Sequence, residues 1–201
     1  MHRLLVSLAT LTVTSFSAAQ QLPEEWAEKL HWRSIGPATM GGRIISLAIY
    51  EAEPTTWWAG TASGGLLKTT NNGISFEPQF QDAHSISIGD IAVAPSAPDT
   101  LYVGTGEANN QRSSYWGNGV YKSTDGGKSF THVGLDGTDH IGRIVVHPTN
   151  PDVVYVAALG ALYTPNPDRG LYRSTDGGDS WEPITDGKVP VGSSGAIAVA
   201  D

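Results

Sequence analysis

The sequence has no cysteine and few basic residues, and both shortages limit what the chain can be. Without cysteine there are no disulfides, so packing and hydrogen bonding must supply the stability of the fold. The bacterial lipoprotein route is also excluded, because it needs a cysteine after an N-terminal apolar run. The 12 Lys and Arg residues are outnumbered by 20 Asp and Glu, for a net charge of -8, and no stretch concentrates them. Nucleic acid is therefore not an expected partner.

Long apolar runs are missing too, since no segment approaches the roughly 20 apolar residues that a membrane span requires. The N-terminus instead carries His2 and Arg3, then the mostly apolar stretch Leu4–Val13, then small residues at 17–19. This order is typical of a secretory signal peptide at residues 1–19. We expect an extracytoplasmic location, either the bacterial periplasm or secretion. A retained, lipid-facing anchor is the alternative.

Residues 20–35 predict two short elements ahead of the repeats. Pro23–Leu30 predicts a short leading helix, because proline is favoured at the first helical position. Trp32–Gly36 is similar to Trp181–Thr185 and predicts a closing strand that pairs with the last module.

The rest of the chain repeats with a period of about fifty residues, marked by Gly42, Gly89 and Gly142. Each copy carries four short extended runs separated by turn residues. In the third copy these runs are Arg143–His147, Val153–Ala157, Gly170–Ser174 and Ser180–Ile184. Apolar and β-branched first runs predict strands that are buried on both sides. Gly, Thr and Pro interrupt every window where a helical repeat would need its period.

Four antiparallel strands per repeat predict an all-β fold, the β-propeller, in which each repeat is one blade. The predicted blades span residues 36–80, 84–134 and 138–186, and a fourth begins at 193–201. A propeller needs roughly four to eight blades. We therefore interpret residues 36–201 as a partial propeller in an N-terminal fragment, whose partners include the remaining blades.

Three turns between third and fourth strands share a pattern. Ser123–Phe130 and Ser174–Trp181 fit S-x-D-x-G-x-[ST]-[WF], and Thr69–Phe76 is a degenerate copy. The pattern predicts a hairpin lock: Asp accepts backbone N–H bonds, Gly supplies positive φ, and the aromatic side chain packs beneath. The structural residues of these Asp-boxes are Asn71, Asp125, Gly127, Phe130, Asp176, Gly178 and Trp181. Each box has too few oxygen ligands for calcium, so no metal and no cofactor are expected.

With three boxes at blade spacing, Gly36–Asp201 resembles the BNR or Asp-box propellers. This superfamily includes sialidases, two-propeller xyloglucanases, sortilin receptors and a photosystem assembly factor. Trp32–Pro37 and Gly41–Ile44 are most similar to large bacterial sortilin-like proteins, which are often labelled glycosyl hydrolases. The resemblance implies the fold, whereas activity varies across the superfamily. The absence of cysteine departs from animal sortilins and disfavours a eukaryotic sorting receptor.

The enzymes of the superfamily match less well at their catalytic positions. The xyloglucanase resemblance would place a catalytic Asp in a T-D-x-G-G context, where this chain has Thr61–Gly65 with Ala62. Alanine cannot act as a general base. The sialidase resemblance would place an Arg in an R-I-P context, but Arg43 is followed by two isoleucines.

Propeller geometry predicts that ligands bind on the face opposite the boxes. The longest loop there is Thr105–Asn118, whose amides and aromatic rings suit peptide or glycan recognition. The alternative is a solvated insertion whose aromatic side chains pack on the neighbouring blade. Tyr163 and Arg169 are weaker contributors. The predicted ligand-binding residues are Arg43, Glu107, Asn109, Asn110, Arg112, Tyr115, Trp116, His140 and Arg143.

Asp90 and Glu107 form the one carboxylate pair that the pattern places on that face, so they are the catalytic candidates. The arginines could instead hydrogen-bond carbonyls of adjacent blades. The first hypothesis is a sortilin-like binding propeller, and the second is a glycoside hydrolase with part of its site further along the chain. An assembly factor for membrane complexes would need a basic face.

Overall fold

The structure, a computed structural model, describes residues 42–109 and 114–184 of the chain. The chain divides into two units, Met1–Gly36 and Pro37–Asp201, and every described residue belongs to the second. The predicted signal peptide, leading helix, closing strand and fourth-blade strand lie outside the described residues.

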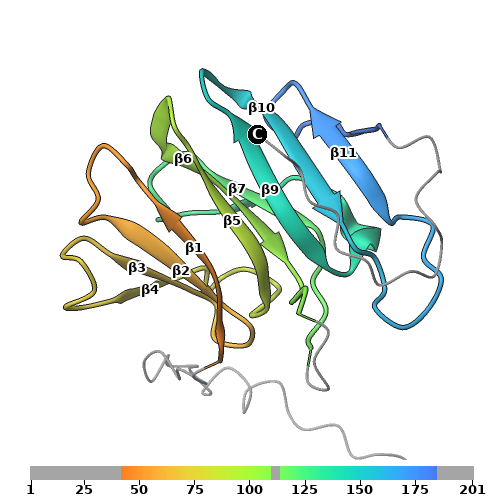
Figure 1. Cartoon of the computed structure of the whole chain (residues 1–201), viewed down its shortest axis with the longest axis horizontal. Coiled ribbons are helices and arrows are strands. Elements are labelled where there is room, and N and C mark those ends of the chain that lie inside the picture. Colours follow the sequence, from red (N-terminus) through yellow and green to blue (C-terminus); the bar gives the residue numbers. More distant parts are fainter. Residues whose placement is uncertain (1–41, 110–113, 185–201) are drawn as a thin grey trace, which may run out of the picture. The chain divides into compact units, whose positions relative to one another are not determined.

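Each repeat forms one four-stranded antiparallel sheet, with its strands in chain order (Figure 1). Sheet 1 contains β1 (Ile44–Ile49), β2 (Trp57–Thr61), β3 (Leu66–Thr69) and β4 (Glu77–Gln79). Sheet 2 contains β5 (Ile88–Ala94), β6 (Ala97–Thr105), β7 (Val120–Ser123) and β8 (Thr131–His132). Sheet 3 contains β9 (Ile141–His147), β10 (Asn150–Ala158), β11 (Gly170–Ser174) and β12 (Glu182–Pro183).

The predicted all-β fold class is confirmed. In the part of the chain that the structure describes, the one helical element is the short 3-10 turn η1 (Asp136–Thr138). Two details differ from expectation. The second strands β6 and β10 begin earlier, at Ala97 and Asn150, because these residues already pair with the ends of the first strands. The fourth strands are shorter, because the Asp-box bonds hold the chain in a turn through Ser129 and Ser180.

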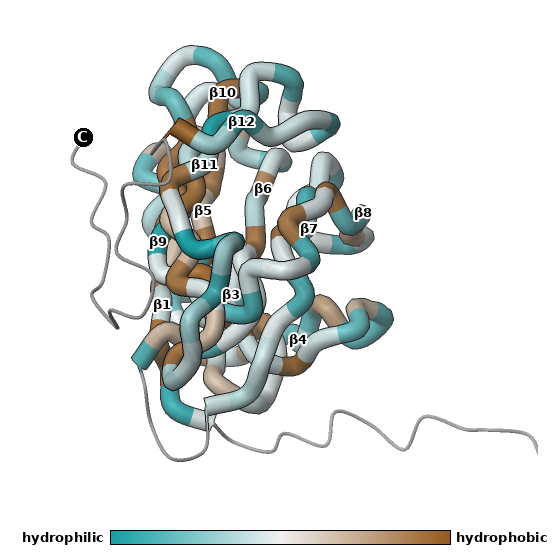
Figure 2. Tube along the Cα trace, turned by 90° about the vertical axis from the view of Figure 1, so that its right-hand side faces the viewer, coloured by the Kyte–Doolittle hydropathy of each residue, from teal (hydrophilic) through white to brown (hydrophobic). Residues whose placement is uncertain are grey.

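The apolar core lies between neighbouring sheets, where side chains from two consecutive repeats interlock. Hydrophobic residues gather along the strands in Figure 2. One cluster joins sheets 1 and 2 and contains Ala48, Trp58, Leu66, Phe80, Ile88, Ile91, Leu101, Val103 and Tyr121. A second cluster joins sheets 2 and 3 and contains Ala94, Tyr102, Val120, Ile141, Ile144, Val146, Val154, Val156 and Ala158.

The first strands are not all buried on both sides as expected. β5 and β9 have most of their apolar residues buried, but Ile44, Leu47 and Ile49 of β1 are exposed. The physical reason is position: β5 and β9 pack against a preceding sheet, whereas no other described sheet covers the outer face of sheet 1.

Each Asp-box is closed by its acidic side chain. Asp125 Oδ1 accepts the backbone N–H groups of Lys128 and Ser129, both at 2.9 Å. The Ser123 hydroxyl donates to Asp125 at 2.7 Å and accepts the N–H of Gly127 at 2.9 Å. Asp176 bonds to Ser174 and Ser180 in the same way, and Asn71 does so in the degenerate first box. One side chain therefore replaces several backbone bonds that the tight turn cannot make.

Glycine and aromatic residues complete the turn. Gly127 and Gly178 adopt φ of 87° and 99°, a region that a side chain makes costly. Phe130 packs edge-on against Phe80 of sheet 1, with ring centroids 4.9 Å apart. Trp181 donates its indole N–H to the carbonyl of Val133 in sheet 2 at 2.6 Å. The second and third boxes thus fasten their own sheets to the preceding ones.

Hydrogen bonds from Ser180 and Ser174 lower the pKa of Asp176 from 3.8 to about 2, and those from Ser129 and Ser123 lower that of Asp125 further. A carboxyl whose folded-state pKa is depressed stabilises the fold above its unfolded pKa and loses that effect as pH falls toward the folded value. We therefore expect the unfolding temperature to drop between pH of about 4 and about 2.

Asp176→Asn should weaken this acid sensitivity while preserving the fold, since Asn71 already closes the first box with an amide. Thermal unfolding at a series of pH values measures the effect. Asp179→Asn, an exposed acid in the same turn, is the control and should keep the parent profile. An unchanged profile in Asp176→Asn would show that the box carboxylates do not set the acid sensitivity.

Candidate functional site

Strand direction separates the two ends of each sheet. β6 runs toward Thr105, and β7 returns toward the box, so the Thr105–Asn118 loop lies at the end opposite the box turn. The box turn itself meets the β5–β6 turn, where Gly126 N–H donates to the Asp99 carbonyl at 2.9 Å. We call the end that carries the long loop and the segments leading into β1, β5 and β9 the loop end.

An ion pair joins sheets 1 and 2 at the loop end. Arg43, just before β1, donates from Nε to Glu107 Oε1 at 3.0 Å and from Nη2 to both carboxylate oxygens at 2.5 Å. The side chain of Glu107 is 0% exposed, whereas that of Arg43 is 46% exposed. Hydrogen bonding to Glu107 raises the pKa of Arg43. The sequence placed both residues at this end, but the partner of Arg43 is a carboxylate rather than a carbonyl.

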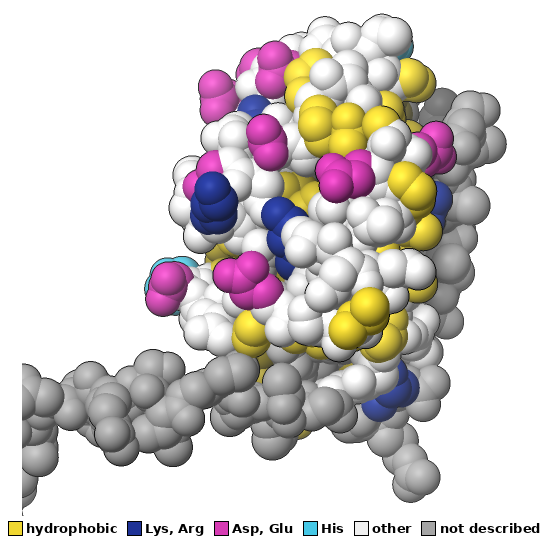
Figure 3. All heavy atoms as spheres, turned by 90° about the vertical axis from the view of Figure 1, so that its left-hand side faces the viewer, with side chains coloured by type: hydrophobic (Ala, Val, Ile, Leu, Met, Phe, Trp, Pro, Cys, Tyr) yellow, Lys and Arg dark blue, Asp and Glu magenta, His cyan; other side chains and the backbone are white. Residues whose placement is uncertain are grey.

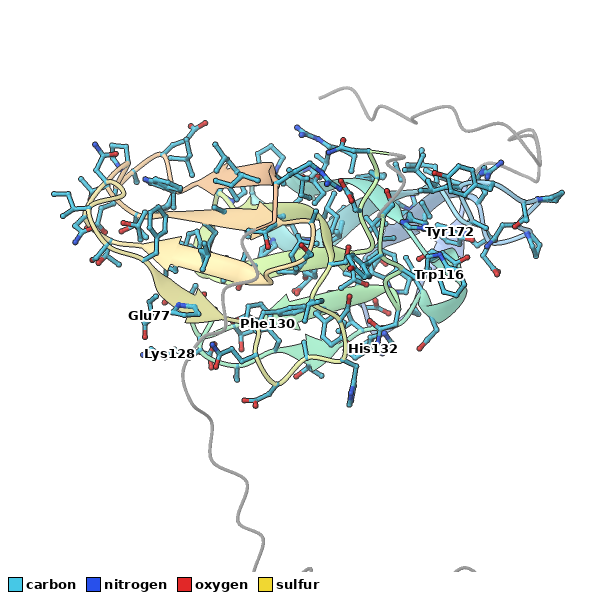
Figure 4. All side chains as sticks on the ribbon, turned by 90° about the horizontal axis from the view of Figure 1, so that it is seen from below. Glu77, Trp116, Lys128, Phe130, His132 and Tyr172 are labelled. Atoms are coloured by element: carbon cyan, nitrogen blue, oxygen red, sulfur yellow. The ribbon has the colours of Figure 1, made fainter. Side chains whose placement is uncertain are left out.

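Ser85 and Ser87 hold the backbone of the long loop by hydrogen bonds. Ser87 donates to the Tyr115 carbonyl at 3.1 Å and accepts the N–H of Glu107 at 3.0 Å. Ser85 donates to the Trp116 carbonyl at 3.5 Å. The backbone is held while the rings face outward: Trp116 is 77% exposed and Tyr115 is exposed as well. Trp116 (Figure 4) therefore presents most of its indole to solvent rather than to the neighbouring sheet.

His140 is buried just before β9, beneath this loop. Burial lowers its pKa, although a hydrogen bond to the Glu107 backbone and the charges of Asp139 and Glu107 act in the opposite direction. Its Nδ1 atom has no hydrogen-bond partner among the described residues. His140 is thus a buried neighbour of Glu107.

Asp90 joins all three sheets. Its carboxylate accepts the hydroxyl of Ser46 in sheet 1 at 2.6 Å and the N–H of Ile144 in sheet 3 at 2.8 Å. Arg143 lies 3.9 Å from the same carboxylate and remains exposed. Asp90 is buried, and both of its oxygens have protein donors.

The remaining candidates are distributed around the loop end. Asn109 is exposed on the long loop, and Asn110 and Arg112 lie outside the described residues. Arg169 is buried and donates to the Leu159 and Ala161 carbonyls, so it closes its own loop. Tyr163 on that loop is exposed.

Sequence reasoning missed Ser46 and Ser87, which hold Asp90 and the long loop. One signal was available for Ser87: it stands two residues before Gly89, as His140 stands two residues before Gly142. Small hydroxyl side chains carry no pattern of their own, and their partners come from distant repeats.

A separate cleft of about 330 Å³ lies at the box end, between β4 and the second box. Glu77, Lys128 and Phe130 line it and lie apart from Trp116 in Figure 4. Within residues 42–109 and 114–184, no three His, Asp or Glu side chains gather to hold a metal ion. The described residues also include no helix long and apolar enough to cross a membrane.

The comparisons with known proteins agree with this architecture. The BNR/Asp-box repeat family matches residues 172–183, which contain the third box. A xyloglucanase from Paenibacillus sp is 24% identical over 196 residues, covering 90% of this chain and 18% of the relative. The repeat match and the three four-stranded sheets fit a BNR/Asp-box β-propeller, with glycoside hydrolase-like relatives.

Solved structures show the same fold. An ancestral GH74 enzyme superposes with a TM-score of 0.57 at 21% identity, covering 76% of this chain and 19% of that one. The GH74 xyloglucanase from Xanthomonas campestris gives a TM-score of 0.52 at 24% identity, covering 77% and 22%. This chain thus spans about a fifth of the length of these relatives.

The ion pair between Arg43 and Glu107 yields a stability prediction. Arg43→Met keeps the aliphatic stem but leaves a buried carboxylate without its cation, so the unfolding temperature at neutral pH should fall. Adding Glu107→Gln to that variant removes the unpaired charge and should recover part of the loss. Thermal unfolding of the parent, both single variants and the double variant measures this coupling. Strictly additive effects would contradict it.

Proposed function

We propose that this chain is an exported Asp-box propeller that binds glycan or peptide at the loop end. The observation that carries the proposal is the anchored loop with its outward rings: Trp116 is 77% exposed although its backbone is held by Ser85. An exposed indole on a fixed backbone binds a ligand at little cost in conformational entropy.

The chemistry of the loop end suits such ligands. The flat faces of Tyr115 and Trp116 can stack on apolar faces of sugar rings or on peptide side chains. Amide groups such as that of Asn109 can donate to and accept from hydroxyls or a peptide backbone. Exposed Arg143, near Asp90, adds donors at the loop end.

The second candidate is a glycoside hydrolase, favoured by the 24% identity to a xyloglucanase. Three features of the loop end weigh against catalysis by this chain alone. Ala62 stands where the resemblance would place the catalytic aspartate, and it is buried with its N–H donating to the Arg43 carbonyl. Glu107 and Asp90 are buried, and the oxygens of both already have protein donors. Neither is positioned as a free acid or base.

Export rests on residues 1–19, whose order of basic, apolar and small residues is that of a signal peptide. A sortilin-like relationship rests on Trp32–Pro37 and Gly41–Ile44. Mass measurement of the protein from a culture's extracytoplasmic fraction tests both the location and the cleavage after Ala19.

Calorimetric titration with xyloglucan oligosaccharides and with a library of peptides tests the binding function. Trp116→Ala should weaken binding about tenfold or more, because a central aromatic contact dominates such sites. Ile74→Ala, which alters an exposed side chain at the box end, is the control and should bind like the parent. Binding that survives Trp116→Ala unchanged would contradict the proposal.

Release of reducing ends from the same oligosaccharides separates the two candidate functions. Cleavage that is abolished by Glu107→Gln or Asp90→Asn would make the chain a hydrolase. Saturable binding without cleavage would support the binding propeller.

A further inference from the structure

The segment that joins η1 to β9 contains a strained residue. Asp139 has φ of 51° and ψ of -49°, and the N–H of His140 donates to the carbonyl of Thr138 across it. This bond and the positive φ make Asp139 the centre of a γ-turn of the rare, strained kind. Such strain persists only where surrounding contacts hold it, and it is concentrated at functional sites. The groups around Asp139 must therefore hold it in place.

The second repeat shows that the strain is not a requirement of the architecture. Ile86 holds the position of Asp139 there, because Ser87 and His140 each stand two residues before the glycine of the first strand. Ile86 does not adopt positive φ. A repeat can thus lead into its first strand without a γ-turn, so the turn in the third repeat needs another explanation.

The γ-turn directs the carbonyl of Asp139 at the long loop of sheet 2. Gly117 donates its N–H to this carbonyl at 2.7 Å, and a side chain on Gly106 would collide with the same oxygen. On the other side, the carbonyl of Trp116 accepts the hydroxyl of Ser85. The peptide group between Trp116 and Gly117 is therefore held at both its carbonyl and its N–H.

A buried amide from sheet 3 holds Asp139 in turn. Asn166 lies on the loop before β11, and its Nδ2 donates to Asp139 Oδ2 at 3.3 Å and to the Gly137 carbonyl at 3.2 Å. Its Oδ1 accepts the N–H of Asp168 at 2.7 Å. One side chain thus fixes its own loop and the γ-turn together, and through the γ-turn it reaches the loop of sheet 2.

The third repeat contains a natural comparison for this amide. The sequence Asn-Pro-Asp occurs twice there, at 150–152 and at 166–168. Asn150 Oδ1 accepts the N–H of Asp152 at 3.0 Å in the β9–β10 turn, as Asn166 Oδ1 accepts that of Asp168. Asn166 adds the two bonds to the η1 segment. The two asparagines therefore share the local bond and differ in the link to Asp139.

We propose that Asp139 is a positioning residue for ligand binding at the loop end. With Asn166 it fixes the peptide group beside Trp116, and so it limits the orientations of the exposed indole. A ring that is already oriented loses less conformational entropy when a ligand binds. Sheet 3 thus contributes to the affinity of a site whose aromatic contact belongs to sheet 2. This inference rests on the proposed binding function.

Hydrogen exchange of the Gly117 amide, measured by NMR on the full chain, tests the positioning without a ligand. Asn166→Ala removes the bonds to Asp139 and Gly137, so the Gly117 amide should exchange about tenfold faster. The amides of β6 and β10 should keep the parent rates. Asp139→Gly should have the same effect, because glycine adopts positive φ without strain but has no acceptor for Asn166.

Ligand affinity is the second measurement, by calorimetric titration with xyloglucan oligosaccharides and the peptide library. Asn166→Ala should weaken binding about tenfold although Trp116 is intact, because the ring must then be ordered by the ligand. Asn150→Ala is the matched control. It removes the same local bond at the box end and should leave both the Gly117 exchange and the affinity unchanged.

Asp139→Asn should restore the parent behaviour, since asparagine keeps a side-chain acceptor and tolerates positive φ. This variant also removes a negative charge, so Glu51→Gln serves as its charge control. Glu51 is exposed in the β1–β2 turn of sheet 1, and Figure 3 shows that the side of sheet 1 carries further acidic side chains. Both variants should match the parent.

Gly117 exchange that is unchanged in Asn166→Ala would overturn the inference. Faster exchange throughout β6 and β10 would also overturn it, because the amide would then support general stability alone. Faster Gly117 exchange with unchanged affinity would overturn the role in binding. A parent chain that binds none of the probes would refute the proposed function itself, whereas the exchange rates would still decide whether Asn166 and Asp139 hold the loop.

Discussion

The fold depends on apolar packing between one repeat and the next. A four-stranded sheet of this size cannot bury both faces by itself, so its stability comes from its neighbours. The two clusters between sheets provide that burial, with Trp58 and Leu66 on one side of the first contact and Ile91 and Tyr121 on the other. The second and third Asp-boxes contribute at the ends of the same contacts, because their aromatic side chains reach the preceding sheet.

The polar groups at the loop end follow from this arrangement. Packed sheets bring their first strands close together, and any charge there must find a partner across the contact. Asp90 does so with Ser46 and Ile144, and Glu107 does so with Arg43. The carboxylates therefore fix one sheet against another. In the proposed binding function, the ligand contact is therefore assigned to the exposed ring of Trp116.

Local pattern was enough to predict the repeat, the strand count and the boxes, since each is encoded within about fifty residues of chain. The contacts of the site were harder because they join different repeats: Arg43 and Glu107 are 64 residues apart. Their contact depends on how two sheets align, and the sequence of a single repeat does not encode that alignment. Ser46 could not be predicted for the same reason. Ser87 could have been found by comparing repeats, because it holds in the second repeat the position that His140 holds in the third.

The contrast among the three sheets also separates what is intrinsic to a repeat from what its neighbours impose. The box turns of sheets 2 and 3 have the same bonds, because those bonds lie within a few residues of chain. Leu47 and Ile91 occupy the same position, but among the described sheets only Ile91 has a preceding sheet packed against it. Burial in this architecture is thus a property of the contact and not of the residue. A substitution at such a position therefore tests the packing of the neighbouring sheet as directly as that of its own sheet.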